Sequence, residues 1–323
     1  MSDEAIWNQY WHFDRVASCF DGAGGSNYDD GIAWGWRAFF KDLPGGTRIL
    51  DLCTGNGAVP LIAVETGREQ GKEFEIVAVD RAEIDPPAFV PRHAEDFAAV
   101  RFVPATDVEA LPFPGAGFDA VTSQYGIEYS NLERALPEAA RMVAPGGRMR
   151  LVVHAADGVV AADALPVIAE ADWLLDEIDL PGRAARCLSA VTFVEREEIV
   201  GAAKRREADA LFAAFQDALG EVAARVPTAH DRAMFKNSGA VLFDTFKRRS
   251  MFRLDQLLAK VGQIEGEIVA HRARLKALVD AGLDAAGAAA LAARLREAGA
   301  KEASCKPLGT FSGLVGRVIE ARF

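Results

Sequence analysis

Three aspartates and two glycines in the first half of the chain have the types and the spacing that indicate a ligand-binding site. Asp51 precedes Gly55 and Gly57 in RILDLCTGNGAVP, an apolar run that leads through a glycine-rich turn into a helical pattern. Asp80 closes the apolar run FEIVAVD, and Asp107 follows the run VRFVPA. Glycine-rich turns of this kind hold ligands at a helix N-terminus. A carboxylate beside the turn attracts a positively charged ligand and repels a pyrophosphate.

Two phosphate-binding motifs fit this turn poorly. The dinucleotide fingerprint G-x-G-x-x-G finds its first two glycines here, but Pro60 stands at the third position, where glycine allows close helix–strand packing. Proline is tolerated in the first turn of a helix, so an NAD site stays open as an alternative. A P-loop is not favoured, because no G-K-[ST] follows the glycines.

The two later acids suit the other parts of a nucleoside ligand. At a strand end, Asp80 can accept hydrogen bonds from both hydroxyls of a ribose, and Asp107 can accept one from the exocyclic amine of an adenine. All three acids stand at the carboxyl ends of successive apolar runs. Open α/β sheets bind their ligands at that edge, so we expect the three acids to converge on one crevice.

The elements that would position these acids are five short apolar runs, separated by helix-compatible or turn-forming segments. The runs cover residues 48–53, 74–80, 100–105, 118–123 and 148–154. This alternation indicates a parallel sheet with helices on both faces. The closing segment GLVGRVIEARF returns to strand composition and suits an antiparallel hairpin. We therefore predict an α/β fold, in which a C-terminal antiparallel hairpin closes a Rossmann-like, seven-stranded, mostly parallel sheet.

Four segments follow from changes in composition along the chain. The first 40 residues hold four of the five tryptophans, which favours either a core-covering helix pair or a lid over an apolar pocket. Residues after His154 are rich in Ala, Leu, Arg and Glu and read as helical. We expect an aromatic N-terminal helical cap or lid (1–45), a ligand-binding domain (46–158), a large helical insertion (159–300) and the closing hairpin (301–323).

Apolar residues in the insertion recur at alternating spacings of three and four from Leu254 to Leu278, which is a heptad pattern. One interpretation is an amphipathic helix that packs inside its own chain. The other is a coiled coil that joins two copies, and hence a homodimer through the helical insertion.

Composition narrows the class of protein. Residues 1–160 contain 13 Lys and Arg against 24 Asp and Glu, whereas residues 161–323 contain 23 of each, so the net charge of −11 lies in the first half. An acidic half that carries the site argues against a nucleic-acid partner. No run of about 20 apolar residues predicts a membrane span, and the acidic start does not resemble a signal peptide. The four scattered cysteines suggest neither disulfides nor a metal site. We expect a cytoplasmic protein, and the excess of Arg over Lys with abundant Ala suggests a bacterial one.

The motifs in register resemble a known family. DLCTGNG, VAVD, ATDVEALPF, FDAVTSQYGIEY and MVAPGGRMRLV are similar, in this order and spacing, to the motifs of class I S-adenosylmethionine-dependent methyltransferases. They are most similar to the small-molecule enzymes related to the ubiquinone-biosynthesis type. The resemblance implies S-adenosylmethionine as the cofactor. It departs at Cys53, where the family has a glycine, which we expect to be tolerated if the side chain points into the core. The fourth strand also lacks the [DN]-P-P-[YF] of many enzymes that methylate base amines.

The resemblance also implies a role for individual residues. The methionine part of the cofactor would be framed by Asp51, Gly55 and Gly57 and lined by Ser123 and Gln124. Asp80 would hold the ribose, and Asp107 with Val108 the adenine. Asn56, Arg81 and Tyr28 complete the expected cofactor set, with Tyr28 near the cofactor's carboxylate.

Methyl transfer from a sulfonium is an in-line displacement, so the protein chiefly aligns the reactants and excludes water. A general base is needed only when the acceptor must lose a proton of high pKa. By position, the candidates are Tyr125, Glu128 and His154. We predict methyl transfer to a small, apolar or aromatic molecule. The alternatives are a cofactor-binding domain used for helix-mediated assembly, methylation of a protein side chain, and an NAD-dependent oxidoreductase.

Overall fold

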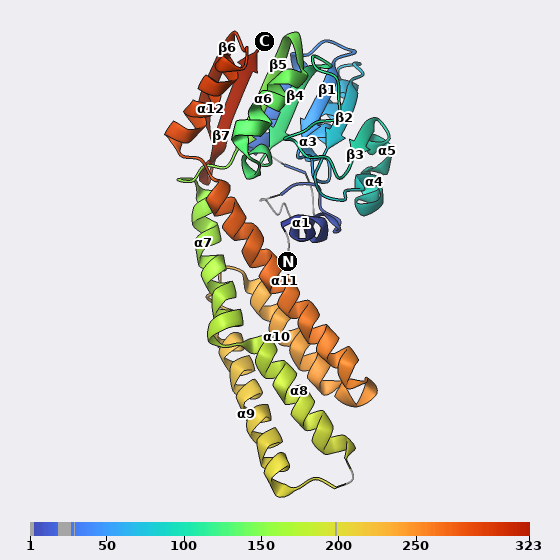
Figure 1. Cartoon of the computed structure of the whole chain (residues 1–323), viewed down its shortest axis with the longest axis vertical. Coiled ribbons are helices and arrows are strands. Elements are labelled where there is room, and N and C mark those ends of the chain that lie inside the picture. The colour runs from blue at the N-terminus through green and yellow to red at the C-terminus, as the bar shows by residue number, and fades with distance from the viewer. Residues whose placement is uncertain (1–2, 19–26, 29, 198) are drawn as a thin grey trace. The chain divides into compact units, whose positions relative to one another are not determined.

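The computed structural model describes residues 3–18, 27, 28, 30–197 and 199–323. The chain divides into two compact units (Figure 1). Unit 1 comprises residues 1–162 and 277–323, and unit 2 comprises residues 163–276. Residues 19–26 and 29 of the expected N-terminal cap lie outside the described residues. Each unit has a core of its own.

Unit 1 is built on one seven-stranded sheet, with the strand order β3-β2-β1-β4-β5-β7-β6. The strands are β1 (Arg48–Leu52), β2 (Glu75–Val79), β3 (Val100–Val103), β4 (Phe118–Gln124), β5 (Val143–Val153), β6 (Glu302–Thr310) and β7 (Gly313–Arg322). The first five run parallel, whereas β7 pairs antiparallel with both β5 and β6. The predicted fold, including the antiparallel closing hairpin, is therefore confirmed.

Alternate residues of each strand feed two cores, one on each face of the sheet. Ile49 joins a core with α2 and α3, whereas the next residue, Leu50, joins a core with α6 and α12. The helices of unit 1 are α1 (Asp3–Trp11), α2 (Asp30–Lys41), α3 (Ala58–Glu69), α4 (Pro86–Phe89), η1 (Pro91–His93), α5 (Ala94–Phe97), η2 (Ile127–Tyr129), α6 (Leu132–Met142) and α12 (Ala285–Glu297). This period-2 alternation is what a sheet covered on both faces requires.

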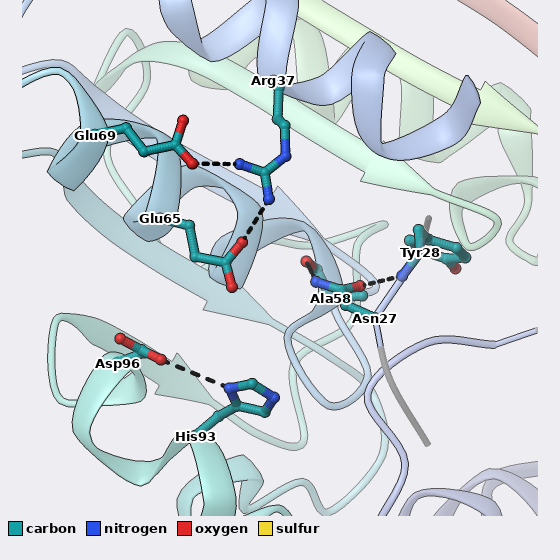
Figure 2. Close-up of polar contacts among 8 residues, drawn as sticks. All are labelled: Asn27, Tyr28, Arg37, Ala58, Glu65, Glu69, His93 and Asp96. Carbon is teal, nitrogen blue, oxygen red and sulfur yellow. Dashed lines mark hydrogen bonds and ion pairs between the residues drawn. The ribbon is translucent and has the colours of Figure 1, made fainter. Parts of the chain in front are cut away.

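Helix α2 is tied to the neighbouring helix α3 by ion pairs (Figure 2). The Arg37 guanidinium donates to the carboxylates of Glu65 and Glu69, at 2.9 Å each. Just before α2, the amide of Asn27 donates to the carbonyl of Ala58, the first residue of α3, at 2.8 Å. These contacts hold residues 27 and 28 beside the turn that precedes α3.

Unit 2 is helical. Its elements are η3 (Trp173–Glu177), α8 (Leu180–Arg196), α9 (Ala202–Arg225), α10 (Arg232–Lys247) and η4 (Arg249–Met251), and the chain enters and leaves it through α7 (Val159–Asp172) and α11 (Leu254–Ala281). The heptad residues Leu257, Val261, Ile264 and Ile268 are buried in its core. The pattern thus describes an amphipathic helix packed inside its own unit.

The boundaries of the insertion differ from the expected range, 159–300. Unit 2 ends at Lys276, because α12 packs on the sheet: Leu291 and Leu295 are buried with residues of β5, β7 and α6. No helix among the described residues is long and apolar enough to cross a membrane.

Candidate active site

The turn between β1 and α3 uses backbone conformations that residues with side chains rarely adopt. Gly55 and Gly57 have φ angles of 54° and 80°, and Cys53 also has a positive φ of 54°. This left-handed region is open to glycine but costs other residues about 1–2 kcal/mol. The amide of Thr54 donates to the carbonyl of Val79 at 3.0 Å. The turn is thereby fixed at the carboxyl ends of β1 and β2.

The N-terminal segment lies on this turn. A Cβ at Gly55 would stand 2.3 Å from the indole of Trp11, so the ring can lie there only because position 55 is glycine. The side-chain amide of Asn56 donates to three main-chain carbonyls, those of Trp11 (2.9 Å), Phe13 (3.3 Å) and Arg15 (2.8 Å). Asn56, which we expected in the cofactor set, therefore turns its amide toward residues 11–15 and holds them on the turn.

Asn56→Asp is expected to release the N-terminal segment, because a carboxylate cannot donate to the three carbonyls and is repelled by them. The rate of tryptic cleavage after Arg15 should rise at least about tenfold, which corresponds to ~1.4 kcal/mol of easier local opening. Limited proteolysis read by mass spectrometry measures this rate. Asn131→Asp is the matched control, because Asn131 caps α6 as an acceptor from the Glu133 amide, a role that aspartate also fills. Equal cleavage rates in the wild type and Asn56→Asp would contradict the assignment.

A pocket opens beside the turn at the carboxyl ends of the strands of unit 1. Its aromatic walls are Trp7, Trp11, Tyr125 and Tyr129, and its charged lining is Glu4, Asp80, Arg81, Asp107 and Glu109. Val108 and Cys53 also line it. Four acids against one base make the pocket negative, which favours cationic ligands.

Asp80 joins the pocket to the glycine turn. Its carboxylate accepts from the amide of Gly55 at 2.7 Å and from the amide of Ala82 at 2.9 Å. Burial raises the pKa of Asp80, against these two hydrogen bonds and the nearby Arg81, which lower it. The carboxylate therefore organises the turn and also faces the pocket, as its place at the end of β2 predicted.

Asp107 and Val108 form the wall that follows β3. The exposed Asp107 carboxylate accepts from the amide of Glu109 at 2.9 Å, which closes a tight turn. Val108 is buried and lies next to it in the lining. Of the expected cofactor set, the structure thus brings Asp80, Arg81, Asp107 and Val108 to one pocket.

Asp51 lies elsewhere, inside the sheet. It pairs in register with Thr122 of β4, whose hydroxyl donates to the Asp51 carboxylate at 2.6 Å. The pKa of Asp51 is raised to about 7, chiefly by burial and also by the charge of Asp80, whereas the Thr122 hydrogen bond lowers it. Asp51 is not among the residues that line the pocket.

The other expected cofactor residues, Gly55, Asn56, Gly57, Ser123, Gln124 and Tyr28, are also absent from the pocket lining. The Ser123 hydroxyl accepts from the Ile127 amide at 3.2 Å, and the Gln124 side chain accepts from the Trp36 indole at 2.6 Å. Tyr28 hydrogen-bonds through its hydroxyl to Ser18 at 3.2 Å. These side chains support the ends of β4 and the segment before α2.

The three candidate catalytic residues lie together, but only one of them reaches the pocket. The buried Glu128 carboxylate accepts from both the backbone amide (2.9 Å) and Nδ1 (2.7 Å) of His154. The His154 ring stacks on Tyr125, with centroids 4.2 Å apart, and meets Tyr129 edge-on. Tyr125 lines the pocket, and its hydroxyl donates to the carbonyl of Val315 at 3.0 Å. The Glu128–His154 pair therefore stands behind the aromatic wall.

The part of unit 1 that carries β1 to β4 and the glycine turn is similar to known proteins. Residues 49–147 match the family model described as a methyltransferase domain. This region is a methyltransferase domain. The demethylmenaquinone methyltransferase of Thermus thermophilus is 43% identical over 35% of this chain and 51% of its own length. The ubiquinone/menaquinone biosynthesis C-methyltransferase UbiE of Methylobacterium nodulans is 37% identical over 31% of this chain and 39% of its own. The chain thus spans about half the length of these relatives, or less.

A solved structure is also similar to part of this chain. An S-adenosylmethionine-dependent methyltransferase from Mesorhizobium loti is 25% identical, with a TM-score of 0.32, over 39% of this chain and 56% of that one.

The methyltransferase domain differs from its family pattern at Cys53. The side chain packs against Gly126, where an added Cβ would stand 2.3 Å from that of Cys53, and it lines the pocket as well as contacting the core. Burial raises the pKa of the thiol well above its ordinary value, and the charges of Asp80 and Glu128 raise it further. The thiol is therefore held in its neutral form.

Because Cys53 has a positive φ, the stability of substituted proteins should follow backbone freedom and not hydrophobicity. Cys53→Gly should stay within about 1 kcal/mol of the wild type, since relief of strain offsets lost packing. Cys53→Val should lose about 2 kcal/mol or more, because a β-branched side chain tolerates this region worst. Urea unfolding of both variants measures the order. A valine variant as stable as the glycine variant would show that the left-handed turn is not required.

Several pocket residues were not in the expected site. Trp7 and Trp11 belong to the aromatic segment that we expected to form a cap or lid, but no sequence motif predicted that either ring lines the pocket. Tyr129 stands four residues beyond Tyr125, on η2, and contacts Trp7 edge-on with centroids 5.3 Å apart. The high density of aromatic residues near the N-terminus was the only sequence feature that pointed to these pocket residues.

Proposed function

We propose that the protein transfers a methyl group from S-adenosylmethionine to a small apolar molecule. The observation that carries the proposal is the acidic pocket of the methyltransferase domain, in which Asp80 and Asp107 stand at the ends of β2 and β3 beside the glycine turn. A carboxylate at each of these places suits the ribose and the adenine of the cofactor. The negative lining suits its cationic end and disfavours a pyrophosphate.

Buried polar atoms near the turn support the same cofactor. Asn56 Oδ1 and Gln124 Nε2 are buried and have no hydrogen-bond partner among the described residues. Buried polar groups are normally hydrogen-bonded. The amino-acid end of the cofactor has matching groups, since an ammonium donates to oxygens and a carboxylate accepts from an amide. We propose that Asp80, Asp107 and Val108, which line the pocket, hold the cofactor, and that the two buried atoms are the partners of its amino-acid end. The cofactor supplies a methyl group on a sulfonium.

The remaining residues of the site align the reactants and exclude water. We propose that Trp7, Trp11, Tyr125 and Tyr129 enclose the reacting groups, which replaces solvent by fixed aromatic walls. Glu128 and His154 act as positioning residues, because they fix the stacking partner of Tyr125 and do not line the pocket. Of the expected catalytic candidates, we propose that Tyr125 touches the acceptor, because it lines the pocket.

The names of the relatives suggest the acceptor class, a demethylated quinone. Its quinol is the form to test, because an electron-rich ring is the better nucleophile toward a sulfonium methyl group. The test is incubation of the full chain with methyl-labelled S-adenosylmethionine and either a demethylated naphthoquinol or whole-cell protein. We expect label in the solvent-extracted quinol and none in the protein precipitate. Label found only in protein would make a side chain the acceptor, and no transfer to any acceptor would overturn the proposal.

Two alternatives have less support. An NAD-dependent oxidoreductase needs the pyrophosphate that the acidic lining disfavours. A role in assembly through the heptad residues is not proposed, nor is a homodimer through them, because Leu257, Val261, Ile264 and Ile268 are buried within unit 2.

We further propose a cytoplasmic location, which the free thiols of Cys53, Cys187 and Cys305 support.

A further inference from the structure

Large apolar side chains are exposed at one end of unit 2. Ile199 is 94% exposed and follows the end of α8, and Met251 is 73% exposed in the turn between α10 and α11. Phe252 and Phe193 are 44% and 48% exposed. Isolated exposed apolar residues are ordinary, but one of these four lies in the last turn of α8 and three lie on two helix-joining turns, so that they form a surface of their own.

The two turns are held against each other. The Arg249 guanidinium pairs with the Glu195 carboxylate at 2.6 Å. In addition, Arg196 donates to the carbonyls of Phe252 (2.6 Å) and Arg249 (3.2 Å). The end of α8 and the α10–α11 turn therefore lie side by side within unit 2 (Figure 1).

The same surface is basic. Residues 199–206 (IVGAAKRR) and 245–254 (TFKRRSMFRL) contain seven Lys and Arg and no Asp or Glu, in a chain whose net charge is −11. Four of these cations pair with acids. Arg249 pairs with Glu195 at the end of α8, and the other three pair with Glu207, Asp244 and Asp255 of the adjoining helices. We call residues 193–197, 199–206 and 245–254 the basic end; together they contain eight Lys and Arg against two Glu.

We propose that the basic end of unit 2 binds the surface of an anionic lipid bilayer. Cations beside exposed aliphatic and aromatic side chains suit that partner, since the charges meet lipid phosphates and the apolar groups enter the boundary of the acyl region. A nucleic acid would match the charges but leave Ile199 and Met251 without a role. A second copy of the same basic end would be repelled. The proposal does not rest on the proposed methyl transfer.

The test is co-sedimentation of the full chain with vesicles of phosphatidylcholine, with and without one third phosphatidylglycerol. We expect binding only to the anionic vesicles, and loss of that binding as salt is raised. The triple change Ile199→Ser, Met251→Ser and Phe252→Ser should weaken binding at least about tenfold, and so should Lys247→Glu with Arg253→Glu. Phe311→Ser is the matched control, because Phe311 is fully exposed on the β6–β7 turn of unit 1.

Circular dichroism and cofactor titration of the same variants separate this proposal from the proposed function. The spectrum and the cofactor affinity should both be unchanged by substitutions in the basic end. Failure to bind anionic vesicles at low salt would overturn the proposal, as would equal binding by the wild type and both variants. Tighter binding to duplex DNA than to the vesicles would overturn it in favour of a nucleic acid.

Discussion

Alanine at position 80 is expected to weaken binding of S-adenosylhomocysteine, the demethylated cofactor, at least about a hundredfold. The Asp80 carboxylate accepts from the amides of Gly55 and Ala82, and hydrogen bonds to a charged acceptor contribute about 1.5–3 kcal/mol each. Its removal loosens the glycine turn and deletes the proposed acceptor of the ribose hydroxyls. A loss of about 3 kcal/mol or more corresponds to that hundredfold change.

Isothermal titration calorimetry measures this affinity, with circular dichroism to show that the variant is folded. Asp80→Asn should bind more tightly than Asp80→Ala, because an amide oxygen still accepts one of the two turn hydrogen bonds. Asp85→Ala is the matched control, since that exposed carboxylate follows the same strand, caps α4 and does not line the pocket. Unchanged affinity in Asp80→Ala would remove Asp80 from the site.

Asp51→Asn is expected to stabilise the protein most in alkaline solution and by less than half as much near pH 5. Burial raises the pKa of Asp51 from 3.8 in the unfolded chain to about 7 in the fold, so the folded state holds the proton more tightly. The wild type therefore loses stability as the pH rises from about 4 to about 7, and the full cost, at most about 4 kcal/mol, is present above pH 7. Asparagine still accepts from Thr122 and carries no charge to bury.

Urea unfolding at pH 5 and pH 8.5 gives the two differences in the free energy of unfolding. Asp119→Asn on β4 is the matched control of opposite sign, because the Arg48 guanidinium lowers the pKa of that carboxyl. Its stabilising contribution is present throughout this range and is lost only in stronger acid, so the control should be destabilised at both pH values. A pH-independent effect of Asp51→Asn would contradict the raised pKa.

The sheet could be predicted from the sequence because its signals are local. Each strand is a short apolar run with turn residues at its ends, and the carboxyl ends of parallel strands share one edge. Asp80 and Asp107 reached the pocket for that reason. Asp51 did not, because the register that sets it opposite Thr122 depends on the pairing of β1 with β4, which no local pattern reveals.

Contacts between distant segments explain the other differences. Trp11 lies on Gly55 and is held by Asn56 of the turn, and nothing in the aromatic composition fixes that placement. Likewise, α12 has the same composition as the helices of unit 2, yet Leu291 and Leu295 are buried against the sheet. The heptad spacing correctly predicted a helix with one buried face, but that face packs against other helices of the same chain and not against a second copy.

The most direct test of the central claim is calorimetric titration of the wild type with S-adenosylhomocysteine and, separately, with NAD. We predict one S-adenosylhomocysteine bound per chain and no heat of binding with NAD, because the acidic pocket favours a ligand with an ammonium group over one with a pyrophosphate. Binding of NAD without binding of S-adenosylhomocysteine would contradict it and would make the glycine turn a dinucleotide site.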